Sequence, residues 1–300
     1  ERKIDLHLRG LEALGAKVEE STNTIICTAD QLIGSEISLD YPSVGATENI
    51  MMAAAKAKGT TIIYNAAREP EIYDLQNYIN AMGGLVMGAG TDTITIQGVD
   101  KLYPCEYEVI PDRIVAGTLM IAAAAAKGTI KLENVRPQHL TSLTHVLKRM
   151  GVQITADGDI MIISSTKVPQ AVDRIITSPY PAFPTDLQSQ IMALLSISEG
   201  VSVIKETVFE GRFKHVDELY RMGADIRVDL NTAFIRGVPR LYGATVEATD
   251  LRAGAALVIA GLAATGTTVV EEIHHIDRGY ERIELLFQQL GANIQRVSTS

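Results

Sequence analysis

The carboxylate of Asp186 is the strongest candidate for chemistry in this 300-residue sequence. Asp186 follows Thr185 and two loop prolines, Pro181 and Pro184, and an apolar run at helical spacing begins at Ile191. Thr185 and Asp186 therefore occupy a position typical of a helix N-cap, where the helix dipole favours a negative charge. Capping is the commoner role for such a residue. The catalytic alternative is a general base that takes a proton from a substrate hydroxyl.

Three more positions along the chain resemble that of Asp186. Ser43, Asp112 and Asp250 each precede a run rich in small and apolar residues, and each can cap a helix. The free N–H groups at a helix N-terminus also bind anions. We therefore expect Ser43, Asp112, Asp186 and Asp250 to begin helices whose N-termini face one shared cleft.

Arginines recur near these helix starts. They take two kinds of position, the first turn of a helix and the loop before the next one: Arg113 and Arg252 in the first, and Arg68, Arg136, Arg212 and Arg278 in the second. A guanidinium matches the geometry of phosphate and carboxylate groups. Any one of these arginines alone is ordinarily a partner in a surface ion pair. Together they favour a shared anion-binding cleft, and the residues leave both interpretations open.

Two series of glycines indicate an internal repeat. One series follows a small-residue helix and precedes a β-branched or apolar run, at Gly59, Gly128, Gly200 and Gly266, with spacings of 69, 72 and 66 residues. The other follows a second helix, at Gly15, Gly83, Gly151, Gly223 and Gly291, with spacings of 68, 68, 72 and 68 residues. The two series run in phase, which is the pattern of one repeated structural unit.

Each repeat is expected to form helix, strand, helix, strand, turn and strand. Four full units begin near Ser43, Asp112, Thr185 and Asp250, after half of a fifth unit. The fold class is therefore α/β. We expect a boundary at residue 111, which gives a first domain over residues 1–110 and a second domain of three units over residues 111–300. Because the chain begins inside a unit, the first domain is expected to be incomplete at its N-terminus.

Three local features follow from the same patterns. Residues 106–110 and residues 266–270 read as strands, and the β-branched composition of the second predicts burial on both faces. Residues 90–93, Gly-Thr-Asp-Thr, read as the turn of a hairpin.

Composition excludes several classes of protein. Acidic residues outnumber basic ones by 36 to 27, for a net charge of −9, whereas nucleic-acid binding needs a basic surface. No apolar run is long enough to span a membrane. The two cysteines, Cys27 and Cys105, and the histidines lack the spacing of disulfide or metal sites. We therefore expect a cytoplasmic protein with no metal, no cofactor, no nucleic-acid partner and no membrane partner.

Eight short segments carry a family resemblance. They are IDLH (4–7), SVGAT (43–47), NAAREPE (65–71), PDR (111–113), FPTD (183–186), TVFE (207–210), ATDLR (248–252) and HIDRGYER (275–282). With these segments the chain resembles the UDP-N-acetylglucosamine 1-carboxyvinyltransferases (UDP-N-acetylglucosamine enolpyruvyl transferases) over its whole length, without their N-terminal segment.

The resemblance implies a fold and an activity. The fold is two inside-out α/β barrel domains of three units each, with helix termini at an interdomain cleft. The activity is transfer of the enolpyruvyl group of phosphoenolpyruvate to the 3-hydroxyl of UDP-N-acetylglucosamine, with release of phosphate. This is the first committed step of peptidoglycan synthesis, a pathway that serves cell wall biogenesis, the maintenance of cell shape and cell division.

Two alternatives stay open beside the enzyme. One is a catalytically inactive sugar-nucleotide-binding module of the same fold. The other is the sister enzyme, enolpyruvylshikimate phosphate synthase, which is not expected to carry this set of motifs. A pure binding module has no chemical need for the charged residues that the chain retains: Asp186, Asp250, Arg212, Arg252 and Arg278.

The resemblance also implies roles for individual residues. Asp186 takes the hydroxyl proton, Asp250 lies near the reacting carbons, and Arg278 holds phosphoenolpyruvate together with Arg2. The remaining binding residues are Asp5 and Leu6 at the uracil, Ser43, Val44 and Gly45 at the diphosphate, Thr185, Asp186, Val208 and Phe209 at the amino sugar, and Arg212 and Arg252 on the carboxylate side of phosphoenolpyruvate. Asp112 and Arg113, at their own helix start, complete the expected binding set.

The sequence departs from the family pattern at several points. Lys3 stands where the family usually has Pro, and Tyr41 where many members have Lys. The family's loop Cys, which adds to phosphoenolpyruvate, and a Lys-Asn pair near its N-terminus do not occur in this sequence, and Cys27 and Cys105 lie elsewhere. Because delivery of a proton to the methylene carbon is part of the chemistry, we expect the 300-residue chain alone to be inactive.

Overall fold

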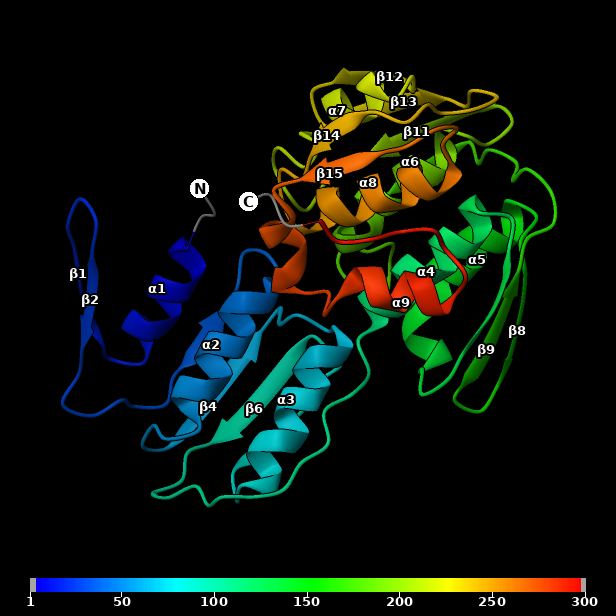
Figure 1. Cartoon of the computed structure of the whole chain (residues 1–300). Helices are drawn as coiled ribbons and strands as arrows, with labels where there is room; N and C mark the ends of the chain where they lie inside the picture. The colour runs from blue at the N-terminus through cyan, green and yellow to red at the C-terminus, as the bar shows by residue number, and fades with distance from the viewer. Residues whose placement is uncertain (1–3, 298–300) are drawn as a thin grey trace. The chain divides into compact units, whose positions relative to one another are not determined.

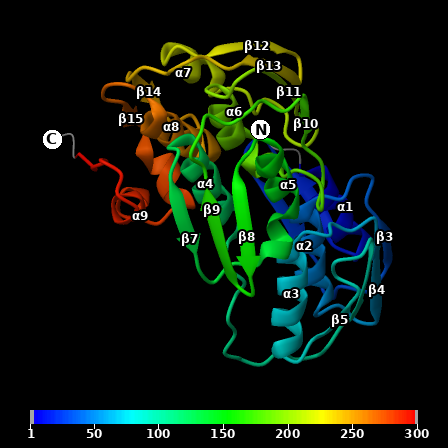
Figure 2. The same cartoon turned by 90° about the vertical axis from the view of Figure 1, so that its right-hand side faces the viewer.

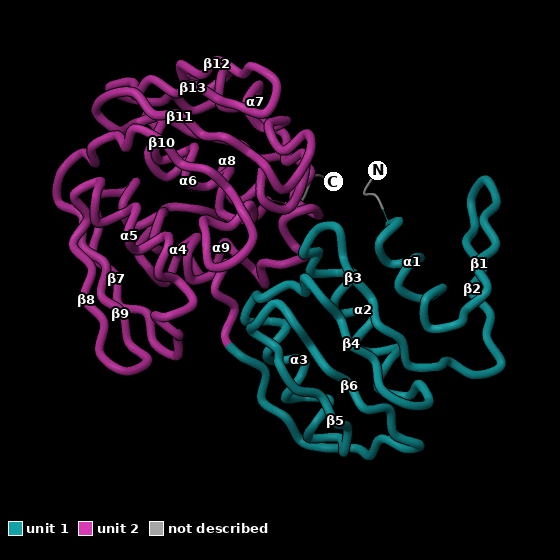
Figure 3. Tube along the Cα trace, turned by 180° about the vertical axis from the view of Figure 1, so that it is seen from behind, with its two compact units in different colours: residues 1–110 teal, residues 111–300 magenta. Residues whose placement is uncertain are grey.

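In the computed structural model, which describes residues 4–297, the chain separates after Ile110 into two units, residues 1–110 and residues 111–300 (Figure 3). In unit 1 the elements are, in chain order, α1 (Asp5–Ala13), β1 (Lys17–Glu20), β2 (Ile25–Thr28), β3 (Glu36–Ser38), α2 (Val44–Ala54), β4 (Thr60–Tyr64), α3 (Pro70–Ala81), β5 (Leu85–Met87) and β6 (Thr93–Gln97) (Figure 1).

Unit 2 continues the alternation of helices and strands. Its elements are α4 (Arg113–Ala125), β7 (Thr129–Leu132), the 3-10 helix η1 (Pro137–Leu140), α5 (Thr141–Arg149), β8 (Gln153–Asp157), β9 (Ile160–Ser164), β10 (Arg174–Ile176), the 3-10 helix η2 (Thr185–Leu187), α6 (Gln188–Leu195), β11 (Val201–Lys205), α7 (Val216–Arg221), β12 (Asp225–Asp229), β13 (Thr232–Arg236), β14 (Thr245–Glu247), α8 (Leu251–Ala263), β15 (Val269–Glu271), the 3-10 helix η3 (Ile273–Arg278) and α9 (Ile283–Gln289).

The sheets repeat one strand order. In unit 1 the order is β3-β4-β6-β5, with β3 parallel to β4 and β6 antiparallel to both of its neighbours. Unit 2 has the same arrangement in β10-β11-β13-β12. The three-stranded sheet β7-β9-β8, whose strands lie side by side in Figure 2, matches the last three strands of that pattern, and the parallel pair β14-β15 matches the first two. The predicted α/β repeat is therefore confirmed.

One face of the four-stranded sheet of unit 1 is buried, because apolar residues alternate along its strands. In β4 and β6 the side chains of Ile63, Ile94 and Ile96 are fully buried, and with Ile50 and Met51 of α2 they belong to the core of unit 1. Their exposed neighbours along each strand face away from that core.

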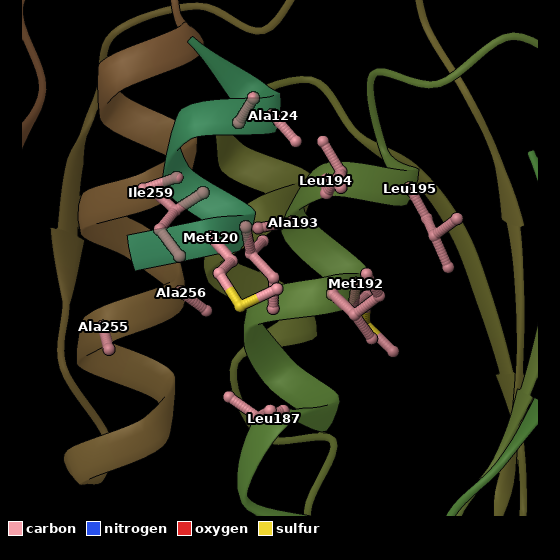
Figure 4. Close-up of a cluster of buried hydrophobic side chains, with 14 of the residues drawn as sticks. Met120, Ala124, Leu187, Met192, Ala193, Leu194, Leu195, Ala255, Ala256 and Ile259 are labelled. Atoms are coloured by element: carbon pink, nitrogen blue, oxygen red, sulfur yellow. The ribbon is translucent and has the colours of Figure 1, made fainter. Parts of the chain in front are cut away.

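Three apolar helices, α4, α6 and α8, form the centre of the unit 2 core (Figure 4). Every residue of α6 is buried, so this helix has no solvent face. Small residues let the helices approach closely. A Cβ atom at Gly117 of α4 would lie 2.7 Å from Cδ1 of Leu187, so only glycine fits there without displacing that side chain.

Helices begin at all four predicted positions, because Thr185 and Asp186 are the first residues of η2, which leads directly into α6. At three of the four the predicted residue is also the cap. Ser43, Asp112 and Asp250 are the N-caps of α2, α4 and α8, and each side chain accepts a hydrogen bond from a first-turn backbone N–H. The predicted hairpin turn lies between β5 and β6, with the Thr91 N–H bonded to the carbonyl of Gly88.

Two predicted strands differ from the structure. Residues 106–110 form no strand. Their alternating pattern lacks a neighbouring strand, and Tyr107 and Ile110 are held instead by the side chain of Asp74 in α3. The prediction that residues 266–270 are buried on both faces is also wrong, because β15 begins only at Val269, pairs with β14 alone, and leaves Val269 48% exposed.

Candidate active site

Asp186 lies in the short helix η2, and its carboxylate forms ion pairs with two arginines. Nη2 of Arg212 donates to Oδ1 at 2.7 Å, and Nε of Arg252 lies 3.4 Å from the same oxygen. The expectation that Thr185 or Asp186 caps a helix is wrong, because neither side chain bonds to a first-turn N–H of η2 or α6. Pro184 is the N-cap residue of η2, and the Asp186 carboxylate forms ion pairs with the two arginines instead.

Arg212 is almost completely buried, at 4% exposed. Besides Asp186, its Nε donates to Oγ1 of Thr185 at 3.3 Å, and its guanidinium carbon lies 4.5 Å from the centre of the Phe209 ring. These contacts fix the guanidinium in one plane, with one edge toward Asp186 and one face on an aromatic ring.

A chain of hydroxyl groups lies beside the second arginine. The hydroxyl of Thr118 in α4 donates to the carbonyl of Ile114 at 2.8 Å, so it accepts from the hydroxyl of Tyr280, which lies 2.8 Å away. The Tyr280 hydroxyl also acts to raise the pKa of Arg252. The hydrogen bonds run in one direction, from Tyr280 through Thr118 to the helix backbone.

Gln190 joins this chain to the backbone of Asp186. Its Nε2 donates to the carbonyl of Asp186 at 2.8 Å and lies 3.3 Å from the oxygens of Thr118 and Tyr280. A side chain from α6 therefore sets the position of the catalytic candidate relative to α4 and to Tyr280.

Electrostatics keep the ion pair charged at neutral pH. Burial acts to raise the pKa of Asp186, but Arg252 and Arg212 outweigh it and hold that pKa below the usual value. Burial likewise acts to lower the pKa of Arg252, and the carboxylate of Asp186 and the hydroxyl of Tyr280 together raise it. Asp186 is therefore ionised at neutral pH.

Asp250 and His215 lie beside this cluster. The Asp250 carboxylate caps α8 by accepting from the backbone N–H groups of Arg252 and Ala253 at 2.8 and 3.0 Å. His215 is fully buried, which lowers its pKa to about 4 although the charge of Asp250 acts to raise it. Its Nδ1 lies 3.1 Å from the carbonyl of Arg212. His215 is therefore neutral at physiological pH and packs under the loop that carries Arg212.

In unit 1 the starts of α1 and α2 come together. A Cβ atom at residue 45 would lie 2.9 Å from Nε2 of His7, so glycine at this position lets the first turn of α1, with Asp5 and Leu6, approach the first turn of α2. Ser43 caps α2 through Ala46, and the N–H groups of Val44 and Gly45 have no acceptor within the helix. These groups form a site of the kind that binds phosphate oxygens.

Asp112 and Arg113 have partners of their own at the start of α4. Asp112 accepts from the N–H groups of Ile114 and Val115, and Arg113 lies over the ring of Tyr180 at 5.6 Å. Arg278 is exposed at the end of η3, two residues before Tyr280. Arg2 and Lys3 lie outside the described residues.

No metal centre or membrane span accompanies the site in the part of the chain that the structure describes. No group of three or more His, Cys, Asp or Glu side chains within residues 4–297 could hold a metal ion. No helix within that range is both long and apolar enough to cross a membrane.

The supporting side chains were not predicted from the sequence. Tyr280 lies inside the segment 275–282, and Glu206 directly precedes the segment 207–210, but neither was predicted to be functional. The sequence shows only that Gln188, Ser189 and Gln190 are three consecutive polar residues before an apolar run, and the structure adds that all three are fully buried. Buried polar groups need partners, which predicts a network at this point.

The chain belongs to the EPSP synthase (3-phosphoshikimate 1-carboxyvinyltransferase) family, whose family model matches residues 1–286. Two of its relatives are UDP-N-acetylglucosamine 1-carboxyvinyltransferases. Enzyme 2 of Caldanaerobacter subterraneus subsp. tengcongensis is 55% identical over 296 residues, which are 99% of this chain and 71% of that relative. Enzyme 1 of Carboxydothermus hydrogenoformans is 56% identical over 297 residues, which are 99% of this chain and 70% of the relative.

Solved structures show the same fold. The enolpyruvyl transferase NikO from Streptomyces tendae matches with a TM-score of 0.87 at 26% identity, over 97% of this chain and 72% of that chain. EPSP synthase from Acinetobacter baumannii matches with a TM-score of 0.74 at 19% identity, over 99% of this chain and 72% of that chain, which is evidence for the fold alone. The resemblance drawn from the eight short segments is therefore confirmed, as is the class of transferase.

Proposed function

We propose that the protein transfers the enolpyruvyl group of phosphoenolpyruvate to the 3-hydroxyl of UDP-N-acetylglucosamine and releases phosphate. The observation that carries the proposal is the Asp186 carboxylate, 2.7 Å from Nη2 of Arg212 and 3.4 Å from Nε of Arg252. The reaction must deprotonate a hydroxyl and bind a multiply charged anion, and this cluster supplies a base and two cations in one place. The name of a relative at 55% identity supports UDP-N-acetylglucosamine as the acceptor and a carboxyvinyl group as the group transferred.

The proposed reaction is an addition followed by an elimination. The acceptor oxygen bonds to C2 of phosphoenolpyruvate while its proton passes to Asp186, and a proton is added at the methylene carbon C3. Loss of a proton from C3 and cleavage of the C2–O bond to phosphate then restore the double bond. Asp186 serves the first step, and the arginines offset the negative charge of the substrate throughout.

Binding of phosphoenolpyruvate prepares Asp186 for this role. Without substrate, Arg212 and Arg252 hold the pKa of Asp186 low. A carboxylate or phosphate group bound against the same guanidiniums offsets part of the positive charge that acts on Asp186. The pKa of Asp186 then rises toward its usual value, so that Asp186 becomes a stronger base when the substrate is in place.

The other predicted residues take binding roles in the same proposal. In unit 1 the N–H groups of Val44 and Gly45 meet the diphosphate at the capped start of α2, and Asp5 and Leu6 meet the uracil. Residues 1–110 and 111–300 are two domains that divide these roles. The reaction feeds peptidoglycan synthesis and takes place in the cytoplasm.

The test is phosphate release by the full-length protein with phosphoenolpyruvate and each of two acceptors. We expect release with UDP-N-acetylglucosamine and none with shikimate 3-phosphate, the acceptor of the enzyme that gives the family its description. Release with shikimate 3-phosphate alone would identify the sister activity. Binding of UDP-N-acetylglucosamine by calorimetry without any release would identify a binding module.

A further inference from the structure

A buried carboxylate, Glu206, joins the two segments that carry the proposed site. Glu206 follows the last residue of β11 and is 4% exposed. Its Oε1 accepts from the Thr177 hydroxyl at 2.7 Å and from the backbone N–H groups of Val208 and Phe209 at 2.8 and 3.0 Å. Its Oε2 accepts from the Thr185 hydroxyl at 3.0 Å. Four donors from three segments therefore converge on one side chain.

Three of these four bonds, from Thr185, Val208 and Phe209, lead toward the proposed site. The loop after β11 carries Val208 and Phe209, and Phe209 lies under the guanidinium of Arg212. Thr185 is next to Asp186 in the chain, and its oxygen accepts from Nε of Arg212. A continuous path thus runs from Glu206 through Thr185 and Arg212 to the carboxylate of Asp186.

The direction of the bonds requires a group at position 206 that only accepts hydrogen bonds. Thr185 uses its oxygen lone pairs for Arg212, so its hydrogen must go to an acceptor. The two backbone N–H groups and the Thr177 hydroxyl also donate. An amide in place of the carboxylate would present an NH₂ group either to the three donors or to Thr185, and at least one bond would be lost in each orientation.

We infer that Glu206 is a positioning residue, which sets the Val208–Phe209 backbone and the Asp186–Arg212 pair in a single arrangement. This inference rests on the proposed function, because the sugar contacts and the base role of Asp186 belong to that proposal. Glu206 touches no substrate in it. Its effect is on where the base and the sugar-binding backbone lie, and small displacements of reacting groups have large effects on rate.

The main variant is Glu206→Gln in the full-length protein. We expect kcat to fall by about 10- to 100-fold, the range for a misplacement on the order of 1 Å, and the Kd of UDP-N-acetylglucosamine to rise. The matched control is Glu218→Gln. Glu218 is likewise a buried carboxylate of unit 2, 7% exposed, but its partners are the backbone N–H of Glu247 at 3.0 Å and the side chain of Arg221 at 3.4 Å, which lie outside the Asp186 cluster.

Both variants should lower the unfolding midpoint, and only Glu206→Gln should change kcat and Kd. Equal kinetic effects of the two substitutions, or wild-type kinetics in a folded Glu206→Gln protein, would overturn the inference. Wild-type protein that releases no phosphate would instead contradict the proposed function, and the comparison of Kd values would still test the role of Glu206.

A second pair of variants keeps the inference testable if Glu206→Gln does not fold. Thr185→Val cuts the path between Glu206 and Arg212 and leaves the three bonds to Oε1, whereas Thr185→Ser keeps the hydroxyl. We expect the Val variant to lose kcat and the Ser variant to recover it. Where all proteins fold, the effects of Glu206→Gln and Thr185→Val on kcat should be less than multiplicative in the double variant. Equal kcat for the Val and Ser variants would show that the path through Thr185 has no role.

Discussion

Replacing Asp186 by Asn removes a charge and a proton acceptor but almost no volume. Asn cannot take the hydroxyl proton, so we expect kcat to fall by roughly 10²–10⁴, the usual effect of losing a general base. This corresponds to about 3–5 kcal/mol of activation free energy. The binding of UDP-N-acetylglucosamine, measured by calorimetry, should largely survive, because the main contacts of the nucleotide are assigned to α1 and α2.

The same substitution should also destabilise unit 2. The side chain of Arg212 is only 5% exposed, so it cannot turn to water when its charged partner is lost. A hydrogen bond to a charged group is worth about 1.5–3 kcal/mol, and the Asp186 side chain is 40% exposed, which reduces that value. We therefore expect a loss of about 1–2 kcal/mol at pH 7, measured by urea unfolding with far-UV circular dichroism.

The sign of the pH dependence follows from the pKa of Asp186, which is lower in the folded protein than in the unfolded chain. Its stabilising effect is complete above the unfolded pKa of about 4 and is lost as the pH falls through the folded pKa. The stability difference between wild type and Asp186→Asn should therefore shrink below about pH 4.

Asp157→Asn, at the exposed end of β8, is the control and should change neither turnover nor stability. Turnover by Asp186→Asn equal to that of the wild type would remove Asp186 from the base role. An unchanged urea midpoint at pH 7 would show that the ion pair with Arg212 does not stabilise the fold.

Three further results are expected. Tyr280→Phe removes the hydroxyl that bonds to Thr118 and acts on Arg252, so it should raise the KM for phosphoenolpyruvate more than that for UDP-N-acetylglucosamine in steady-state assays; equal increases would contradict this role. Ser43→Ala removes the cap of α2 and should cost about 1 kcal/mol of stability and weaken UDP-N-acetylglucosamine binding, whereas Ser43→Thr, which can still cap, should retain both. The His215 imidazole should titrate near pH 4 by NMR. Because its pKa is lower in the folded protein than in the unfolded chain, the stabilising effect of the neutral imidazole should be fully present above about pH 6.5. The free energy of unfolding should then fall by about 3 kcal/mol as the pH is lowered to 4. A titration near pH 6.5 would show that His215 is not buried as described.

The helix starts were predictable because their causes are local. Ser43, Asp112 and Asp250 have a capping side chain and a following apolar helix within a few residues, so propensity and pattern agree with the fold. Asp186 has similar local signals. Its actual partners, Arg212 and Arg252, come from segments far along the chain, and only the tertiary structure brings them to it.

The errors at the strands have a related cause. A strand is stable only when a neighbour accepts its hydrogen bonds, and the alternation at residues 106–110 says nothing about whether such a neighbour exists. The same limit applies to burial at Val269, where β15 has one partner strand. Glu206 and Tyr280 were missed because a buried polar residue is recognised by the donors and acceptors around it, which the sequence does not display.

The small side chains of α4 and α8 have a thermodynamic consequence for unit 2. Residues 122–125 are four buried alanines, and residues 253–256 are three alanines and one glycine. An alanine side chain has no rotamers to lose on folding, whereas a buried leucine or isoleucine loses about 0.5–1 kcal/mol of conformational entropy. These two stretches of α4 and α8 therefore pack into the core with almost no entropic cost from their side chains. Ala→Leu at these positions would add both volume and rotamer freedom, and each of these changes would oppose folding.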